Sequence, residues 1–438
     1  MTSIARLSGI LRTLLFTEAD QLAKQAGVIQ RQRVFSGASL VQLLVFGWLT
    51  KPQGGSSHLA RFAGSLGLHL SKQAMEGRFT MRTADWLLAV LRRGVQFLVC
   101  AEAVSMPLLR RFTAVLIEDG STISLPAALG QVWRGCGGSA SAAALKLTVR
   151  LDLLKGSLCG PYVQDGRTQE TQSPLREQQM PRGSLWIGDL GYFALTWLTQ
   201  LVRQGVYFLM GYTEPITLWD ARGERVEVLD LLPTDGQELV DIPVSLGARK
   251  QVQARLIAKQ MPERVVKRRR EHLKEQAHKQ GKPLNPRQWE LLQWTIMLTN
   301  VPLSLLVAAE AMALMRARWQ IELLWKLWKD LGKVDEWQTA NPQRILCELY
   351  AKLLGMLVQH WLLLLSCWDD PHRSLVGASQ VIREQVPTLV HGLTGRLPLG
   401  KALRLLTQAL GGGCSIPRRQ TRLSTSHRLL EPLGRGLT

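Results

Sequence analysis

Three carboxylates stand where they could support metal-dependent chemistry. The apolar run TAVLIED ends in Glu118 and Asp119, SLWIGD ends in Asp189, and MRARWQIELLWKLWKD contains Glu322. Strand ends are where α/β sheets place their sites, and converging carboxylates suit Mg²⁺, which prefers oxygen ligands. Two such ions roughly 4 Å apart would activate the attacking oxygen and stabilise the leaving oxygen of an in-line displacement. The pattern indicates phosphodiester chemistry, in which water attack gives a nick and attack by a DNA 3′-hydroxyl gives strand transfer.

The period of two in a strand sends Glu118 and Asp119 to opposite faces, so only one of them can point into a site, and the alternation does not say which.

In the third segment, cations flank Glu322 at helical spacing. Arg318, Glu322, Trp325 or Lys326, and Lys329 recur every three or four residues, which places them on one helical face. Such a face could hold a metal while its cations grip phosphate oxygens. An amphipathic helix with ordinary salt bridges has the same spacing.

An α/β core must position these groups. From about residue 112, the short β-rich runs TAVLIED, ALKLTVRLDLL, SLWIGD, GVYFLMGY and WTIMLTN predict strands, with a helix beginning near Tyr192. The first two aspartates would then occupy the last positions of their strands. A long helix is predicted from about Leu303 to Leu331, and more helices follow to about residue 411.

The first 105 residues show helical periodicity and contain a candidate helix-turn-helix. One helix would end near Gly64 to Gly67, and Ser71 would cap a second that carries Lys72, Gln73 and Arg78 toward a major groove. Two short helices joined by a glycine turn also occur in any helical bundle.

Residues 213–290 form a different block, first strand-like and then strongly basic. The basic part cannot be a core element, so it is predicted to be a solvated helix or hairpin arm, with DNA lying against the segment KRRR (Lys267, Arg268, Arg269 and Arg270). The predicted organisation is a helical DNA-binding domain (1–105), the first part of a catalytic domain (106–212), the β-rich and basic insertion (213–290), the end of the catalytic domain (291–335), a helical C-terminal region (336–411) and a basic tail (412–438).

The charge balance favours a polyanionic partner. Lys and Arg number 54 against 34 Asp and Glu, which leaves a net charge of +20. Phosphate neutralisation with counterion release makes nucleic acid the leading candidate, ahead of an anionic membrane or charge kept for solubility alone.

The six scattered cysteines are predicted to be reduced thiols of a cytoplasmic protein. The apolar stretch from Tyr350 to Trp368 is broken by polar residues, which indicates a buried helix rather than a membrane span.

The chain resembles the DDE transposases of bacterial insertion sequences, in particular the family named after insertion sequence four. The resemblance is carried by EDGSTISLP, ALKLTVRLDLLKG, GDLGYF and the spaced Tyr, Arg, Glu, Lys signature, for which RWQIELLWKLWK supplies Arg318, Glu322 and Lys329. Met315 stands where the family usually has tyrosine, which removes a hydroxyl that could contact phosphate.

The resemblance implies an RNase H-like catalytic fold, α/β in class, with a β-rich insertion. It implies Asp119, Asp189 and Glu322 as the catalytic triad holding two Mg²⁺ or Mn²⁺ ions, and Arg318 and Lys329 as binders of the transferred DNA end. It also implies cut-and-paste transposition, double-stranded terminal inverted repeats and target DNA as partners, and a homodimer in the synaptic complex, acting at the bacterial nucleoid.

Two alternatives from other classes stay open. A catalytically silent DNA-binding protein derived from a transposase is favoured only by Met315, and an RNase H-like DNA nuclease would cleave without strand transfer. A peripheral membrane protein fits less well, because the basic segment has almost no apolar face to insert.

Overall fold

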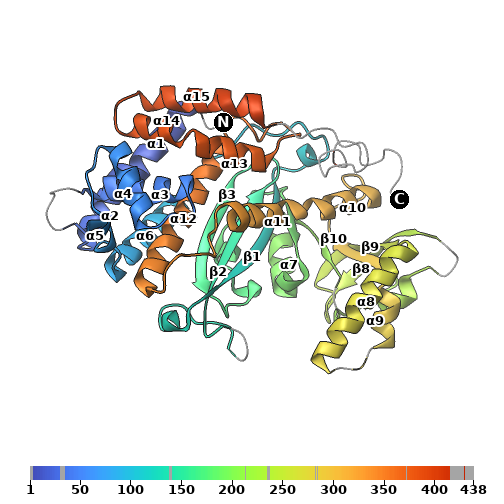
Figure 1. The fold of residues 1–438 in the computed structure, drawn as a ribbon. Helices are drawn as coiled ribbons and strands as arrows, with labels where there is room; N and C mark the ends of the chain where they lie inside the picture. The colour runs from blue at the N-terminus through green and yellow to red at the C-terminus, as the bar shows by residue number, and fades with distance from the viewer. Residues whose placement is uncertain are drawn as a thin grey trace. The chain divides into compact units, whose positions relative to one another are not determined.

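The computed structural model describes residues 3–29, 35–137, 141–212, 214–233, 237–281, 283, 285–370, 372–414 and 429 (Figure 1). The chain forms two compact units. Unit 1 comprises the described residues of Met1–Ser105, Asp119–Leu175 and Trp319–Arg422, and unit 2 those of Met106–Glu118, Arg176–Arg318 and Leu423–Thr438. Most of the predicted tail, 412–438, lies outside the described residues. The other predicted segments stay predictions, because each unit is built from pieces of several of them.

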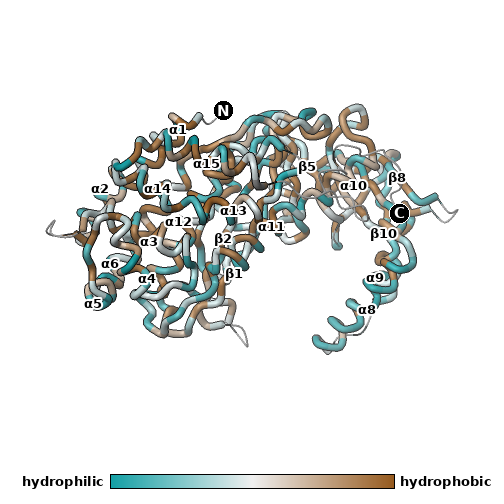
Figure 2. Tube along the Cα trace, turned by 45° about the horizontal axis from the view of Figure 1, so that its top comes forward, coloured by the Kyte–Doolittle hydropathy of each residue, from teal (hydrophilic) through white to brown (hydrophobic). Residues whose placement is uncertain are grey.

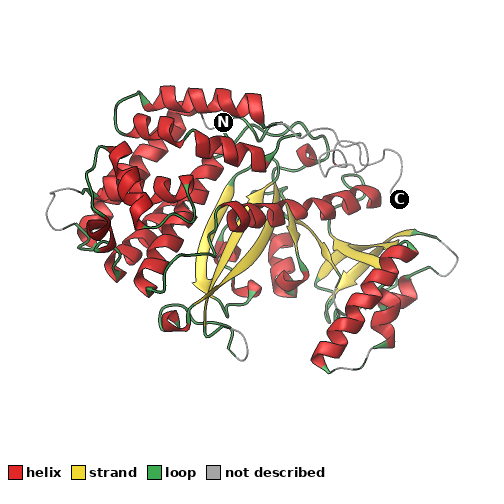
Figure 3. Cartoon of the chain, viewed as in Figure 1, coloured by secondary structure: helices red, strands yellow, loops and turns green. Residues whose placement is uncertain are grey.

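Unit 1 is mainly helical, and its first helices confirm the prediction for residues 1–105 (Figure 3). Its helical elements are α1 (Ile4–Arg12), η1 (Thr13–Glu18), α2 (Ala19–Gln25), α3 (Gly37–Thr50), α4 (Ser56–Ala63), η2 (Gly64–Leu66), α5 (Lys72–Glu76), α6 (Met81–Gly94), η4 (Ala127–Leu129), η5 (Glu170–Gln172), α11 (Trp319–Lys326), η9 (Leu327–Leu331), α12 (Pro342–Leu363), α13 (Leu375–Glu384), α14 (Val386–Leu393) and α15 (Leu399–Gly413).

Helix α12 forms the centre of this unit. It begins where Asn341 accepts hydrogen bonds from the backbone N–H groups of Gln343 and Arg344, with Pro342 at the first position, where its missing N–H costs nothing. All of its residues from Arg344 to Leu363 are buried, which confirms the predicted buried helix. No helix in the described part of the chain has the length and apolar character needed to cross a bilayer.

Unit 1 also holds three strands in the order β3-β2-β1: β1 (Val115–Leu125, of which Asp119–Leu125 belong to this unit), β2 (Ala143–Asp152) and β3 (Leu158–Asp165). Strands β2 and β3 are antiparallel. Strand β3 is not among the predicted strands, because Gly160 and Pro161 interrupt its sequence. Its position at an edge of the sheet explains why proline is tolerated there, since an edge strand has N–H positions that need no ladder partner.

Unit 2 continues the sheet from the first residues of β1 in the order β1-β4-β5-β10-β9-β8-β6-β7. Its strands are β4 (Leu185–Gly188), β5 (Tyr207–Gly211), β6 (Leu218–Trp219), β7 (Arg225–Val226), β8 (Leu239–Leu246), β9 (Val252–Gln260) and β10 (Trp294–Thr299). Its helical elements are η3 (Leu109–Arg111), η6 (Pro174–Glu177, shared at its first two residues with unit 1), η7 (Leu190–Tyr192), α7 (Leu195–Arg203), η8 (Val228–Leu231), α8 (Glu263–Gln280), α9 (Pro286–Leu291) and α10 (Ala308–Ala317).

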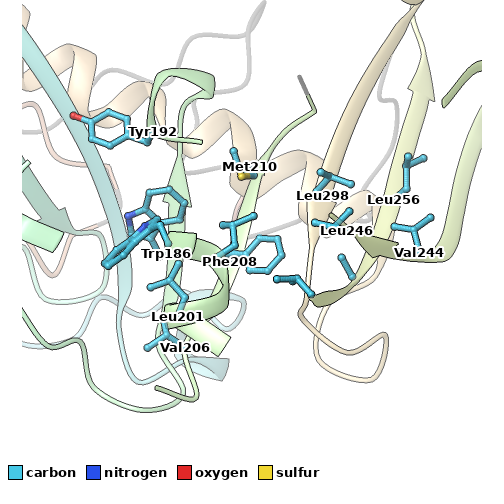
Figure 4. Close-up of a cluster of buried hydrophobic side chains, with 14 of the residues drawn as sticks. Trp186, Tyr192, Leu201, Val206, Phe208, Met210, Val244, Leu246, Leu256 and Leu298 are labelled. Atoms are coloured by element: carbon cyan, nitrogen blue, oxygen red, sulfur yellow. The ribbon is translucent and has the colours of Figure 1, made fainter. Parts of the chain in front are cut away.

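The strand directions divide this sheet. β1, β4 and β5 are parallel, with Ile187 of β4 aligned to Ile117 and Leu209, whereas the pairs that join β5, β10, β9, β8, β6 and β7 are antiparallel. The chain is therefore a mixed α/β protein with a large, mostly antiparallel sheet, and all five predicted strands are confirmed. The side chains of unit 2 form one apolar core cluster, in which Trp186, Phe208 and Met210 from β4 and β5 are completely buried (Figure 4).

The block 213–290 is confirmed as strand-like first and basic afterwards. It supplies β6 to β9 and then α8, a helix of 18 residues. Figure 2 shows α8 in teal, the colour of hydrophilic residues, along most of its length. Among its described side chains only Val266 is buried, so α8 is the solvated helix that its composition predicted.

Candidate active site

Asp119 lies within β1 rather than at its end, which corrects the predicted position. The strand continues from Asp119 to Leu125, because GSTISL keeps extended backbone after the apolar run has ended. The Asp119 side chain is half-buried. Its Oδ2 accepts a hydrogen bond from the indole Nε1–H of Trp325, at 3.2 Å.

The neighbouring Glu118 has the opposite environment. It is only 1% exposed, and its Oε2 lies 3.5 Å from the Nε1–H of Trp186 on β4. Alternation along the strand therefore turns Glu118 into the core of unit 2 and leaves Asp119 as the carboxylate of the pair that is accessible. This difference favours Asp119 as the functional residue.

Glu322 is half-buried on α11, in the same unit as Asp119. The helical segment that contains Glu322 lies against β1 at two points. Trp325 reaches Asp119, and Nζ of Lys329 donates to the carbonyl oxygen of Thr122, at 3.4 Å. Unit 1 thus brings together one candidate aspartate, the Glu322 helix and one candidate phosphate-binding lysine.

The helical segment predicted from about Leu303 to Leu331 is confirmed from Ala308 onward, but it consists of three successive elements. Helix α10 begins at Ala308 and ends at Ala317, Arg318 interrupts the helical run, and η9 is a π-helical turn over Leu327–Leu331. A π turn bonds residue i to i+5, so the three-to-four spacing used to place Lys329 on the Glu322 face does not extend that far. Lys326 is exposed on α11.

Asp189 directly follows β4, as predicted for a strand end. Its Oδ1 accepts a hydrogen bond from the N–H of Leu190, at 2.8 Å, and so caps the short turn η7. Its other oxygen lies 3.9 Å from Nη1 of Arg318, with the Asp189 side chain 48% exposed. An ion pair this long and exposed contributes little to stability, so it leaves the carboxylate available for another cation.

The donor set fits a hard divalent cation, since all three candidates offer carboxylate oxygens. Asp119 and Glu322 belong to unit 1 and Asp189 to unit 2. Within the described ranges, no three His, Cys, Asp or Glu side chains are grouped closely enough to hold a metal ion.

The four cations of KRRR on α8 have different surroundings. Lys267 and Arg268 are exposed. The guanidinium of Arg269 donates to the carbonyl oxygens of Leu292 and Trp294 and to Oγ1 of Thr295, at 3.1, 2.8 and 2.8 Å. Burial lowers the pKa of Arg269, and the positive charge of Arg268 adds to this effect.

Arg270 stacks on the ring of Trp289, 5.0 Å from the ring centre. Arg269 and Arg270 therefore fasten α8 to β10 and α9. Of the four cations of KRRR, only Lys267 and Arg268 are exposed.

The candidate helix-turn-helix is present in outline. Helix α4 is followed by η2, and the hydroxyl of Ser71 caps α5 by accepting from the N–H of Ala74, at 3.1 Å. The second helix has only five residues. Its Lys72 is exposed, whereas the guanidinium of Arg78 lies over the ring of Phe35 at 5.1 Å. DNA recognition by this unit stays a prediction.

Two residues that touch the candidate site were not singled out from the sequence. Spacing offered Trp325 only as a neighbour of Lys326, and nothing in the sequence signalled that its indole would reach Asp119. Arg176, which holds the turn after Asp189, lies in a segment without a motif. The Trp325 contact joins residues 206 apart in the chain and the Arg176 contact residues 16 apart, and both depend on side-chain directions that no local pattern specifies.

A mixed α/β sheet with carboxylates on or after neighbouring strands, in a basic chain, is typical of enzymes that act on nucleic acids. The family model of the transposase DDE domain matches residues 110–357, more than half of the chain. The chain belongs to this family, and the resemblance to DDE transposases of bacterial insertion sequences is confirmed. The matched residues include both aspartates, Glu322 and the β-rich insertion.

Three individual proteins that are similar to this chain are also transposases. The transposase for insertion sequence element IS231C of Bacillus thuringiensis subsp. berliner is 26% identical over 363 residues, which cover 77% of this chain and 75% of that protein. The transposase for IS231B of the same organism is 24% identical over 363 residues, with the same coverage. The transposase for IS1151 of Clostridium perfringens is 23% identical over 365 residues, 78% of this chain and 76% of its own length.

Proposed function

We propose that this chain is a DNA transposase that cleaves insertion-sequence ends in a metal-dependent reaction and joins them to target DNA, with Asp119, Asp189 and Glu322 as its catalytic carboxylates. One observation carries the assignment of the site. Within the matched domain, the accessible aspartate of β1 is hydrogen-bonded to the helix that bears Glu322 and Lys329. A carboxylate held in this way is preorganised for its ligand.

An RNase H-like core is supported by the strand order β3-β2-β1-β4-β5, in which β1, β4 and β5 are parallel and β2 and β3 antiparallel. Residues 213–290 interrupt this core between β5 and β10. In parallel sheets, functional groups gather at the carboxyl ends of the strands. The place of Asp189 directly after β4 follows that rule.

The carboxylates would hold two Mg²⁺ or Mn²⁺ ions, which supply Lewis acidity for the attacking and leaving oxygens when bound. The chain's own residues set the geometry. Trp325 occupies one lone pair of Asp119, and the N–H of Leu190 occupies one of Asp189. Arg318, Lys326 and Lys329 carry the positive charge that phosphate oxygens of the cut end require.

DNA is the partner that the net charge of +20 favours, since each neutralised phosphate releases counterions. Lys267 and Arg268 on α8, and Lys72 and Arg78 near α5, are the proposed contacts to the flanking duplex. The substrates would be terminal inverted repeats and target DNA, bound by a homodimer that pairs two ends at the bacterial nucleoid.

Two alternatives predict different products. A silent DNA-binding protein, favoured only by Met315 on α10, would bind ends without cutting them. An RNase H-like nuclease would cut without joining. The family relationship favours the transposase over both, because the relatives from Bacillus thuringiensis and Clostridium perfringens are transposases.

The test is cleavage of a plasmid that carries the DNA ends bordering the coding sequence, with Mg²⁺, Mn²⁺ or EDTA. We expect wild-type protein to release the element only with metal, and Asp119→Asn, Asp189→Asn and Glu322→Gln to abolish release while still binding the ends. Asp330→Asn, which removes an exposed carboxylate from η9, is the matched control and should cleave normally. Strand transfer is measured in the same reaction by labelling the DNA ends and detecting the label that is joined to a second, target plasmid.

Cleavage that survives any of the three carboxylate changes would remove that residue from the assignment. Binding by the wild-type protein without cleavage under every metal would support the silent alternative. Cleavage without joining would support the nuclease.

A further inference from the structure

Arg176 lies in η6, at the point where unit 2 resumes after Leu175, and no motif marks it. Its side chain nevertheless makes directed contacts. Nη2 donates to the carbonyl oxygen of Tyr192, at 2.6 Å, and the guanidinium lies over the ring of Trp197, 5.2 Å from the ring centre. The hydrogen bond uses the edge of the planar guanidinium and the stacking uses its face. A lysine ammonium cannot make both contacts.

The carbonyl that Arg176 binds belongs to the turn that begins at Asp189. In this turn the N–H of Leu190 donates to Oδ1 of Asp189 and the N–H of Tyr192 donates to the backbone oxygen of Asp189, at 2.8 and 3.0 Å. The direction of the Asp189 carboxylate thus depends on the turn's conformation. Arg176 fixes the far end of the turn.

The buried carboxylate of Glu118 also acts electrostatically on Arg176. Burial lowers the pKa of Arg176, and the negative charge of Glu118 opposes that effect. Glu118 is 1% exposed and is the residue directly before Asp119 in β1. A carboxylate so deeply buried requires a compensating charge or hydrogen bond, and Arg176 supplies the charge.

We propose that Arg176 is a positioning residue for the DNA-cleavage reaction, which holds the far end of the turn that begins at Asp189. The inference rests on the proposed function of the two aspartates. It assigns Arg176 no contact with DNA or metal. Its effect is exerted through the orientation of Asp189, and a small displacement of a reacting group is enough to slow a reaction by orders of magnitude.

Four variants of the full chain test this role. Arg176→Met removes the hydrogen bond, the stacking charge and the counter-charge, and Arg176→Lys keeps only the charge. The double variant Glu118→Gln with Arg176→Met removes both charges, so that no buried carboxylate is left uncompensated. Arg203→Met, on the exposed end of α7, is the control for losing one positive charge from the same unit.

Cleavage of the plasmid is measured in single turnover over a series of Mg²⁺ concentrations, and end binding is measured in Ca²⁺. For Arg176→Met and the double variant we expect cleavage slower by about tenfold or more, a higher Mg²⁺ concentration for half-maximal rate, and end affinity unchanged within about twofold. Arg176→Lys should recover part of the rate. Arg203→Met should follow the wild type in rate and in Mg²⁺ dependence.

Hydrogen exchange of the amides of residues 190–193 gives a readout that does not require activity. These amides should exchange faster in both Met variants, and amides of the central strand β5 should stay protected. Wild-type protection in 190–193, or a wild-type cleavage rate and Mg²⁺ dependence in the double variant, would overturn the positioning role. If wild-type protein itself fails to cleave, the proposed function fails, whereas the exchange experiment still decides whether Arg176 holds the turn.

Discussion

The indole of Trp325 donates a hydrogen bond to the carboxylate of Asp119, at 3.2 Å between Nε1 and Oδ2. Trp325 is 7% exposed and meets the ring of Trp328 edge to face, with centroids 5.4 Å apart. The indole is therefore held in one orientation by packing. It fixes the orientation of one oxygen of Asp119.

The first prediction concerns this hydrogen bond. Trp325→Phe keeps an aromatic ring in the packed position but removes the N–H donor. Because hydrogen bonds to charged groups are worth about 1.5–3 kcal/mol, we expect single-turnover cleavage to fall about tenfold or more, with end binding maintained. Trp328→Phe, which alters the completely buried neighbouring ring, should lower the unfolding temperature with a much smaller effect on cleavage. Equal cleavage rates for the two variants would show that the indole N–H does not position Asp119.

The second prediction concerns Lys329, which is tied to β1 through the carbonyl of Thr122. We expect Lys329→Ala to weaken binding of cleaved ends at low salt, because one phosphate contact is lost. The slope of log affinity against log salt should become shallower by about 0.9. Lys401→Ala, on the exposed face of α15, is the matched control and should keep the wild-type slope. The affinity for cleaved ends is measured by titration at several salt concentrations. An unchanged slope for Lys329→Ala would argue against a phosphate contact.

The third prediction concerns stability. Lys352 and Glu348 of α12 form an ion pair at 2.7 Å with side chains 1% and 2% exposed. The ammonium also donates hydrogen bonds to the carbonyl oxygens of Lys333 and Glu336. Burial lowers the pKa of Lys352 and raises that of Glu348, in each case against the attraction of the partner.

Removing one partner of a buried pair leaves the other charge uncompensated, at a cost of about 3–5 kcal/mol. Glu348→Gln should therefore lower the free energy of unfolding by roughly that amount in denaturant titrations. Glu336→Gln breaks the Lys333–Glu336 pair, whose side chains are 31% and 43% exposed, and should have a much smaller effect because solvent screens the two charges. Equal effects of the two changes would contradict the structural difference between the pairs.

Much of the fold follows from local pattern. The five β-rich runs, the buried α12 and the solvated α8 each have one dominant signal in the sequence: alternation, continuous apolar character or continuous charge. The place of Asp189 after β4 follows from its apolar run in the same way. Ser71 caps α5 because serine before a helix can bind the free N–H groups of its first turn.

The remainder depends on long-range contacts. The predicted end of β1 at Asp119 failed because polar residues continue the strand to Leu125 without an apolar signal. The π turn of η9 has no sequence signature, so helical spacing could not predict that the helix changes its hydrogen-bonding pattern at Leu327. Arg269 resembled its basic neighbours in composition, and only the carbonyl oxygens of Leu292 and Trp294 show that it anchors α8.

The last prediction concerns acid stability and rests on His360, a residue of α12 that is 2% exposed. Its Nε2–H donates to the carbonyl oxygen of Gly156, at 2.7 Å. Burial lowers the pKa of His360 to about 4, against the contribution of that hydrogen bond. The folded protein therefore resists protonation of this ring, whereas the unfolded chain accepts the proton near pH 6.5.

Because the unfolded state binds more protons in this window, stability falls as pH is lowered from about 6.5 to about 4. The contribution of His360 over the full window is on the order of 3 kcal/mol. His360→Gln keeps an N–H donor for Gly156 but cannot titrate, so its free energy of unfolding should decline less steeply than that of the wild type. His391→Gln, at an exposed position on α14, should follow the wild-type decline. Denaturant titrations at pH 7, 6, 5 and 4.5 compare the three proteins, and parallel curves for wild type and His360→Gln would show that this histidine does not govern the acid sensitivity.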